Sequence, residues 1–315
     1  MQDIYEYLTD KSTVFEKKFS NTITRVRLGS EDKKILEIGG DTSLPYFAAP
    51  HKKPQTALCI LDSINDYPKP FIDEFGETAL TPVAWASTCL DTYKPDMLSL
   101  RFTVRNNQVW LKEAHNIVRN ISGSCDLPLM LDVDGEPSLA ASALQSLSED
   151  VSPRTLLAAA SLDGRYKILV KAATQGDHVL VAETDCDPTT QRTLNTKLLD
   201  EGLPNDRIVM DPTTAALGLG LEYSISIIEQ LRSEALKGDT VTQFPIVATR
   251  AAPNSWRARE AWFEDPKTAP PQIRGPIWEA HTALALFLAG ADLIAILHPT
   301  VDDMIKKIFG GKRRE

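Results

Sequence analysis

Cysteine is scarce in this sequence, and its copies lie too far apart to hold a metal together. They are Cys59, Cys89, Cys125 and Cys186. A zinc site or an iron–sulfur cluster normally uses at least one closely spaced pair such as C-x-x-C, and the five histidines form no H-x-x-x-H pair either. We therefore expect no metal site and no iron–sulfur cluster in this chain, and we interpret the cysteines as reduced thiols of a cytoplasmic protein.

Excess basic charge and long apolar runs are also missing. The formal net charge is -9, and the only basic cluster is at residues 312–314, so the sequence argues against a nucleic-acid partner. No stretch approaches the ~18 apolar residues of a membrane span. The first ten residues, MQDIYEYLTD, contain acidic side chains and no apolar core of a secretory signal. These absences predict a cytoplasmic protein that binds neither nucleic acid nor a membrane.

Short apolar runs recur along most of the chain, and stretches with helical spacing lie between them. The runs open at Thr56, Met97, Leu127, Thr155, His178, Arg207, Phe244 and Asp292. One clear helical face is formed by Trp110, Ala114, Ile117, Val118 and Ile121. Eight strand–helix repeats in about 250 residues are typical of a (β/α)8 TIM barrel. A doubly wound open sheet is the alternative, but eight evenly placed units favour a closed barrel.

The segment before the first run predicts a cap for one end of the barrel. Residues 1–20 have helical apolar spacing, and residues 23–28 and 34–38 alternate like the two strands of a hairpin. We expect this helix and hairpin to cover the barrel bottom. The predicted divisions are a cap and connector of residues 1–55, a barrel of residues 56–305 and a basic tail of residues 306–315.

The sixth apolar run ends in a polar corner. It stops at Asp211 and Pro212, because proline lacks a backbone donor and biases the preceding residue away from helical angles. Thr213 and Thr214 follow, and helical spacing then continues to Lys237. We expect a carboxylate, two hydroxyls and free amides to meet at the start of this helix, which suits an anionic or polar ligand.

Gly218 and Gly220 fall inside this predicted helix. A G-x-G pair invites a dinucleotide interpretation, but that fingerprint needs a third glycine and a place in the turn between strand and helix. Neither condition is met in the sequence, so we do not predict a dinucleotide site.

In a barrel, binding and catalytic side chains come from the C-terminal ends of the strands. Here those ends carry Asp62, Arg101, Asp132, Asp134, Asp163, Glu183, Asp185, Asp211, Arg250 and His298. The alternative is that these residues only cap helices and bridge loops. No G-x-S-x-G motif is present, and no Ser-His-Asp triad can be read from the spacing. From barrel geometry alone we select Arg101, Asp132 and His298 as candidate ligand-binding residues.

A long insertion lies between the seventh and eighth runs. It holds three of the five tryptophans, which are Trp256, Trp262 and Trp278. Trp256 with Arg257 and Arg259 has the composition of a protein interface core. The alternative is that these aromatic side chains pack the insertion itself.

Four separate segments resemble one known family. They are GGDTSLPYF, MDPTTAALGLGLEYS, NSWRAREAW and RGPIWEAHTALALFLAGADL. Their order and spacing are similar to the small subunit of the corrinoid iron–sulfur protein, the delta subunit family of the acetyl-CoA decarbonylase/synthase complex. The resemblance runs from about Arg25 to Pro299, nearly the whole chain. It implies a (β/α)8 barrel paired with a large subunit that carries the iron–sulfur cluster and a corrinoid-binding domain.

The resemblance also implies a function. The heterodimer would carry methyl groups between methyltetrahydrofolate:corrinoid methyltransferase and acetyl-CoA synthase in the reductive acetyl-CoA pathway. This barrel would not catalyse the transfer; its mouth would shield the upper face of the corrinoid (cobalamin), shared at the interface. The matching segments carry Asp211, Thr213, Thr214, Asn254 and Trp256 into that cofactor-facing site. The alternative is a pterin-binding methyltetrahydrofolate methyltransferase on the same barrel, with Asp132, Asp211 and Asn254 around the pterin.

Overall fold

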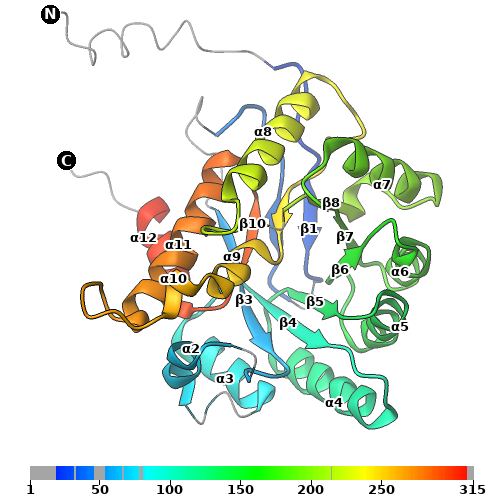
Figure 1. The fold of residues 1–315 in the computed structure, drawn as a ribbon. Coiled ribbons are helices and arrows are strands. Elements are labelled where there is room, and N and C mark those ends of the chain that lie inside the picture. The colour runs from blue at the N-terminus through cyan, green and yellow to red at the C-terminus, as the bar shows by residue number, and fades with distance from the viewer. Residues whose placement is uncertain are drawn as a thin grey trace, which may run out of the picture.

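Eight parallel strands form a nearly closed barrel with helices around it (Figure 1). The computed structural model describes residues 19–31, 33–45, 54–65, 67–76, 78, 81–213 and 215–310. The strand order is β8-β7-β6-β5-β4-β3-β10-β9. A parallel bridge between Met210 and Ile246 joins the two ends of this order. The predicted TIM barrel is therefore confirmed, and the open-sheet alternative is wrong.

Each predicted apolar run forms one strand of the barrel. The strands are β3 (Gln55–Leu61), β4 (Met97–Thr103), β5 (Leu129–Asp134), β6 (Leu156–Ala160), β7 (Val179–Glu183), β8 (Ile208–Asp211), β9 (Val247–Ala248) and β10 (Leu293–Ile296). Nearly all their side chains are buried, as expected for parallel strands with a packed interior on one face and helices on the other. β9 is the shortest, and Pro245, two residues before it, has no N–H to donate to a ladder.

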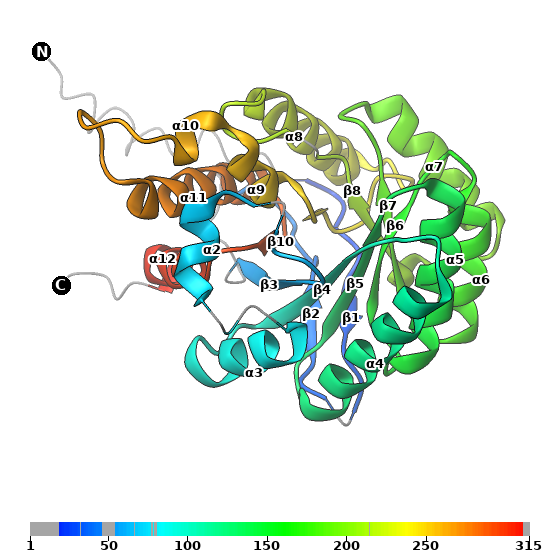
Figure 2. The same ribbon diagram turned by 60° about the horizontal axis from the view of Figure 1, so that its bottom comes forward.

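Helices connect successive strands and run around the outside of the barrel (Figure 2). They are α2 (Lys69–Phe75), α3 (Pro82–Thr92), α4 (Gln108–Ser124), α5 (Pro137–Leu147), α6 (Arg165–Gln175), α7 (Pro188–Asp200), α8 (Leu221–Lys237), α9 (Ala251–Asn254), α10 (Arg259–Trp262), α11 (Pro271–Ala289) and α12 (Pro299–Gly310). Single 3-10 turns are η3 (Ser148–Asp150), η4 (Asn205–Arg207) and η5 (Ser255–Arg257). Side chains of Thr81, Asn107 and Asp187 accept hydrogen bonds from the first turns of α3, α4 and α7, which satisfies backbone donors that a helix start leaves open.

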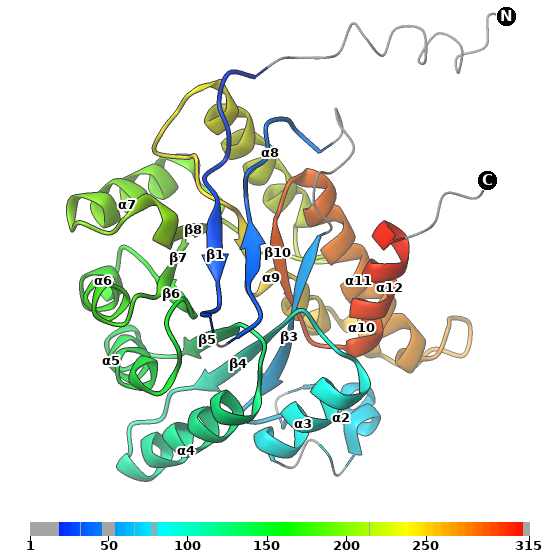
Figure 3. The same ribbon diagram turned by 180° about the vertical axis from the view of Figure 1, so that it is seen from behind.

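The predicted hairpin is confirmed, and it crosses the bottom of the barrel (Figure 3). Its strands are β1 (Val26–Leu28) and β2 (Leu36–Ile38), paired antiparallel. Backbone N–H groups of Gly29 and Lys34 donate to the carbonyls of Arg154 and Asp126, at 3.1 and 2.7 Å. Both acceptors precede barrel strands at their N-terminal ends, so the hairpin covers the end opposite the mouth. The helix predicted for residues 1–20 lies outside the described residues, apart from the last two.

A buried ion pair fastens the end of the hairpin to the barrel. The carboxylate of Asp292 accepts from the backbone N–H of Gly39 at 3.1 Å and of Ile246 at 2.8 Å, and it also pairs with Arg232. Gly39 has a φ of +75°, and a Cβ there would lie 2.1 Å from the carbonyl oxygen of Thr24. Because the ring of Pro245, just before β9, would also lie 2.9 Å from that Cβ, only glycine fits between Thr24 and the barrel here.

Two boundaries differ from the sequence prediction. Gly218 and Gly220 have φ of +82° and +87° and lie in the loop before α8, not inside the helix. These left-handed angles delay the helix until Leu221. At the other end, α12 continues to Gly310, so residues 306–310 are helical rather than part of a tail, and residues 311–315 lie outside the described residues. Across the part of the chain that the structure describes, no helix is long and apolar enough to cross a membrane.

Candidate functional site at the barrel mouth

A pocket of about 650 Å³ opens at the C-terminal ends of the strands. Its lining comes from the ends of β3, β4, β5 and β7 and from the insertion after β9. The polar lining residues most relevant to chemistry are Tyr67, Arg101, Asp134, Glu183, Arg250 and Asn254. Arg257 and Trp262 of the insertion also line it. The size falls within the range of small-molecule sites, roughly 300–1,000 Å³.

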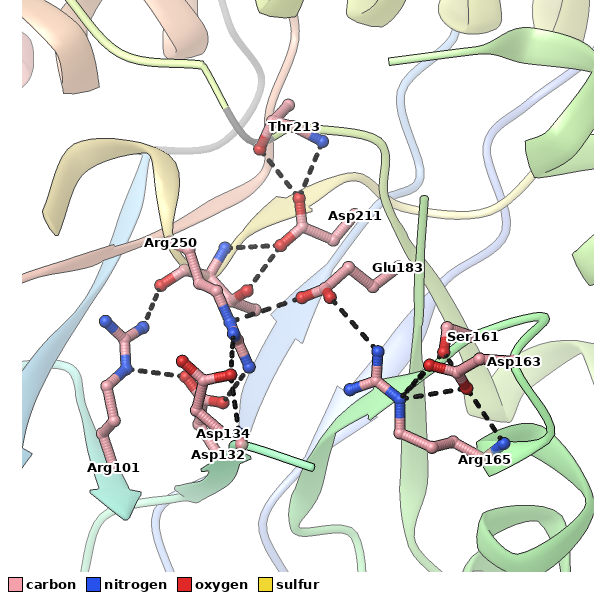
Figure 4. Close-up of polar contacts among 12 residues, drawn as sticks. Arg101, Asp132, Asp134, Ser161, Asp163, Arg165, Glu183, Asp211, Thr213 and Arg250 are labelled. Atoms are coloured by element: carbon pink, nitrogen blue, oxygen red, sulfur yellow. Dashed lines mark hydrogen bonds and ion pairs between the residues drawn. The ribbon is translucent and has the colours of Figure 1, made fainter. Parts of the chain in front are cut away.

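Asp132, in β5, is fully buried and contacts two arginines of the mouth (Figure 4). Its Oδ2 accepts from Arg101 Nε at 2.7 Å, and its Oδ1 accepts from Arg250 Nη2 at 2.9 Å. Burial alone would lower the pKa of Arg101, but Asp132 beside it raises that pKa above the ordinary value. Arg101 also donates to the carbonyl oxygen of Thr249 at 2.5 Å. The predicted pair of Arg101 and Asp132 is thus brought together, as a buried ion pair.

Arg250 is the centre of the charged network. Besides Asp132 it contacts Asp134 Oδ1 at 2.8 Å and Glu183 Oε2 at 3.4 Å. Asp132 raises the pKa of Arg250 against the opposing effect of burial. Burial would raise the pKa of Asp134, but Arg250 holds it below the ordinary value. One guanidinium therefore stays charged between three carboxyl groups (Figure 4). Arg250, Asp134 and Glu183 were noted at the strand ends but not selected.

Glu183 is less closely paired than Asp132 and Asp134 at the mouth. Its nearest cations are Arg250 at 3.4 Å and Arg165 at 3.9 Å, both longer than a good charged hydrogen bond. Arg165 instead bonds closely to Asp163, at 3.0 Å. Burial raises the pKa of Glu183 to about 7 despite Arg250. This side chain therefore changes charge near neutral pH.

The stability of the protein should show this titration. The folded-state pKa of Glu183, about 7, lies above its ordinary value of 4.5. The stabilising contribution is therefore full below about pH 4.5 and is lost as the pH rises through about 7. Between about pH 4.5 and 7, the unfolding free energy of the native chain should fall as the pH rises. In Glu183→Gln this fall should be smaller by up to about 1.4 kcal/mol per pH unit. Urea unfolding at several pH values measures it, with the exposed Glu201→Gln as control. Parallel profiles for Glu183→Gln and the native chain would contradict this assignment.

Asp211 and Thr213 form a closed structural unit rather than an exposed corner. Asp211 Oδ1 accepts from the N–H and hydroxyl of Thr213 at 3.0 and 2.8 Å. Its Oδ2 accepts from the N–H and hydroxyl of Thr249 at 2.7 and 2.6 Å. Both Asp211 and Thr213 are buried, and α8 begins only at Leu221. The predicted position at a helix start is therefore wrong, because α8 begins later and these groups tie β8 to the residue after β9. Thr214 lies outside the described residues.

Trp256 is buried, not exposed as an interface core requires. Only 2% of its surface is accessible, and its indole N–H donates to Glu279 Oε2 at 2.8 Å. The ring of His298 stacks on it with centroids 6.1 Å apart, and Phe71 meets its edge. Burial lowers the pKa of His298 to about 4, so this imidazole is neutral at pH 7. The predicted exposed cluster of Trp256, Arg257 and Arg259 is thus corrected, because the turn at η5 directs the tryptophan into the core while Arg257 stays exposed.

Asn254 takes an intermediate position at the mouth. It ends α9, its backbone N–H donates to the carbonyl oxygen of Arg250 at 2.8 Å, and it lines the pocket. Of the predicted site residues, Arg101, Asn254 and Trp256 border the pocket, with Asp132 directly beneath. His298 lies behind Trp256, and Asp211 and Thr213 brace the neighbouring strands. Tyr67, which also lines the pocket, was not predicted because it lies several residues beyond the end of β3.

A second polar cluster lies on the outer helical layer. His115 Nε2 is 3.0 Å from Ser146 Oγ, and His115 Nδ1 contacts Asp150, which also pairs with Arg119 at 2.8 Å. This order of groups is that of a serine hydrolase triad. Ser146, however, lies in the last turn of α5, where backbone N–H groups serve the helix and are not free to stabilise an oxyanion. We interpret the cluster as a tie between α4, α5 and η3.

No metal centre emerges from the part of the chain described here. Among those residues, no group of three or more His, Cys, Asp or Glu side chains is placed to hold an ion. Burial raises the pKa of Cys59 to about 11 and of Cys89 to about 12, so both thiols stay protonated at neutral pH.

Comparison with known proteins relates this barrel to one family. Residues 25–299 match the family described as CO dehydrogenase/acetyl-CoA synthase delta subunit. The chain is 34% identical over 293 residues to subunit delta 1 of the acetyl-CoA decarbonylase/synthase complex of Methanosarcina thermophila, covering 89% of this chain and 66% of that protein. With the delta subunit of Methanocaldococcus jannaschii it shares 32% identity over 302 residues, or 92% of this chain and 74% of that protein. The chain thus spans only part of the length of these relatives.

Among solved structures, dihydropteroate synthase of Xanthomonas albilineans in complex with 7,8-dihydropteroate has a similar barrel. The TM-score is 0.58, and the match covers 92% of this chain and 99% of that one. The sequences are only 13% identical, so the likeness concerns the fold alone.

Proposed function

The chain belongs to the CO dehydrogenase/acetyl-CoA synthase delta subunit family, and from this we propose that it is the barrel subunit of a methyl-carrying corrinoid iron–sulfur protein. Its partner is a large subunit that holds the iron–sulfur cluster and the corrinoid. The heterodimer carries methyl groups between methyltetrahydrofolate:corrinoid methyltransferase and acetyl-CoA synthase. In this proposal the barrel mouth covers the upper face of the corrinoid, and the barrel itself performs no chemical step.

The observation that carries the proposal is that the mouth is open, while its two fully buried acids, Asp132 and Asp211, are already paired with other groups of the protein. Both oxygens of Asp132 are paired with arginines, and within the described part of the chain Asp211 accepts four hydrogen bonds from Thr213 and Thr249. A general acid or base must be free to exchange a proton with a bound substrate. A rigid, internally neutralised surface is better suited to contact and shielding than to proton transfer.

The rim of the mouth supports a covering role. Several large apolar side chains are exposed on segments that follow barrel strands. They include Val109, Leu162, Leu219, Tyr223 and Trp262, and of these Trp262 lines the pocket. Exposed apolar side chains on the end of the barrel that carries a polar opening are typical of a surface that another protein or domain covers. The rim is therefore the part of the chain that we expect to meet the large subunit.

The pocket chemistry also suits a corrinoid face. The corrin ring is bordered by amide side chains, which both donate and accept hydrogen bonds. Asp134, Glu183 and Asn254 offer acceptors at the pocket surface, and Arg257 offers donors at its edge. When bound, the corrinoid supplies a cobalt that carries the methyl group. These residues would hold the amide border, and the surrounding apolar rim would exclude water and oxidants from it.

The alternative, a pterin-binding methyltransferase, requires free carboxylates for the pterin. In that alternative the carboxylates would be Asp132 and Asp211. Both are buried, and both oxygens of each accept hydrogen bonds from other residues of the chain. The similarity to dihydropteroate synthase concerns the fold and gives no evidence for a free carboxylate here. The structure thus favours the subunit over the enzyme.

An assay of methyl transfer separates the two functions. The chain alone should not accelerate methylation of free cob(I)alamin by methyltetrahydrofolate, because loss or absence of a general acid typically removes ~10²–10⁴ in rate. Co-expression with the large subunit should yield a heterodimer with the visible spectrum of a corrinoid. A rate more than about tenfold above buffer for the chain alone would favour the methyltransferase. If the large subunit were purified from the co-expressing cells without this chain bound to it, the proposed heterodimer would be contradicted.

A further inference from the structure

The mouth pocket already contains a cationic group of the chain itself. Arg250 reaches across it from the end of β9 and contacts Asp132 at 2.9 Å, Asp134 at 2.8 Å and Glu183 at 3.4 Å. The three acids come from the ends of β5 and β7 (Figure 4). Asp134 and Glu183 line the open pocket, as does Arg250. The guanidinium is thus placed where an incoming molecule would meet these carboxyl groups.

The acids around Arg250 have the chemistry of a site for a flat ring with several N–H donors. A guanidinium is planar and presents N–H groups in a fork that fits carboxylates. The 2-amino-4-oxopyrimidine ring of a pterin presents a similar edge, with an amino group beside a ring N–H. Carboxylates that accept from one can accept from the other. The volume of about 650 Å³ does not exclude a bicyclic ring.

We propose that Arg250 is an internal ligand of the barrel mouth, which occupies the carboxylates that would otherwise bind a pterin-type ring. Its side chain decides the specificity of the pocket. With Arg250 in place, small planar N–H donors are excluded and the mouth is left for contact with a partner. The inference goes beyond the proposed corrinoid function and does not require it.

Removal of Arg250 should leave the barrel folded, because the negative charge of each acid is still stabilised by another cation or by water. Asp132 keeps its 2.7 Å bond to Arg101. Asp134 has half of its side chain exposed to water. Glu183 still faces Arg165, at 3.9 Å. The vacated space is therefore expected to be a charged, hydrated cleft rather than a collapsed core.

The test measures binding of two probes, pterin itself (2-amino-4-oxopteridine) and methylguanidinium, to the purified chain by calorimetry and thermal shift. The native chain should bind neither. Arg250→Ala should bind both with a Kd at or below about 1 mM, and millimolar methylguanidinium should raise its melting temperature. Arg250→Gln, which keeps an amide donor to Asp132, should bind pterin and serves as the second variant if the alanine variant is poorly folded.

The matched control is Arg165→Ala. It removes a guanidinium near the same acid, Glu183, but leaves Arg250 in the pocket, so it should bind neither probe. The proposal is overturned if the native chain binds pterin as tightly as the Arg250 variants do. It is equally overturned if the folded variants bind neither probe. Because the assay contains no corrinoid and no large subunit, either result leaves the proposed corrinoid function to its own test.

Discussion

Trp256→Ala is expected to lower the free energy of unfolding by about 3–5 kcal/mol. The indole is 2% accessible and packs against His298 and Phe71, so its loss leaves a cavity that the barrel wall can close only in part. It would also leave Glu279 without the 2.8 Å bond from the indole N–H, and a buried acceptor without its donor adds to the cost. Urea or thermal unfolding of the isolated chain measures the loss.

The control is Trp262→Ala, in the same insertion. Trp262 is 37% exposed, and its truncation should cost less than about 1 kcal/mol, as is usual for surface changes. The comparison separates two roles for Trp256. If Trp256→Ala were as stable as the native chain but bound the large subunit poorly, Trp256 would be an interface anchor and the buried assignment would be wrong.

Asp132→Ala is expected to lower the free energy of unfolding by about 3–5 kcal/mol as well. The change leaves Arg101 and Arg250 facing each other with their shared acid removed. Arg250 keeps Asp134 and Glu183, but the buried Arg101 loses the ion pair that offset its desolvation penalty. Chemical unfolding near neutral pH should therefore show an earlier midpoint with a similar slope.

Asp134→Ala is the matched control for this network. Asp134 also pairs with Arg250, at 2.8 Å, but its side chain is 50% exposed. An ion pair so open to solvent typically contributes about 0–1 kcal/mol. If both variants lost the same free energy of unfolding, the ion pairs of Arg101 and Arg250 with the buried Asp132 would have no special importance for stability.

The barrel could be predicted because its strands are recognisable from the sequence alone. A parallel strand covered on both faces appears as a continuous apolar run, as in β3 and β6. The start of α8 could not be predicted from periodicity. Leu217 fits the apolar spacing of the helix, but the left-handed angles of Gly218 and Gly220 keep the chain out of helical geometry until Leu221.

The mouth was predicted in position but not in its contacts. Barrel geometry places Arg101 and Asp132 at adjacent strand ends, and the parallel register pairs them directly. The contact of Arg250 with Asp132 joins residues 118 positions apart, and it depends on how the barrel closes and which rotamer the arginine adopts. No spacing in the sequence contains that information.

Trp256 and Asp211 show why composition and segment likeness alone did not place side chains. Tryptophan next to arginine is typical of interfaces, yet the turn at η5 buries one and exposes the other. A carboxylate followed by threonines suggests a ligand corner, but the same hydroxyls can satisfy the acid locally, as Thr213 does. Whether Trp256 and Asp211 meet a partner or the chain itself depends on how far each is buried, and burial is known only once the chain is folded.

The lifetime of Co(I) in the large subunit, with and without this chain, tests the central claim most directly. The account predicts that added chain slows the oxidation of Co(I) severalfold under a fixed trace of oxygen, followed by its visible absorbance. Trp262→Ala, which changes the exposed rim, should weaken this protection. Leu288→Ala, which changes an exposed residue near the end of α11, should not. An oxidation rate that is the same with and without this chain, in a heterodimer shown to be intact, would contradict the role of the barrel mouth as a cover for the corrinoid.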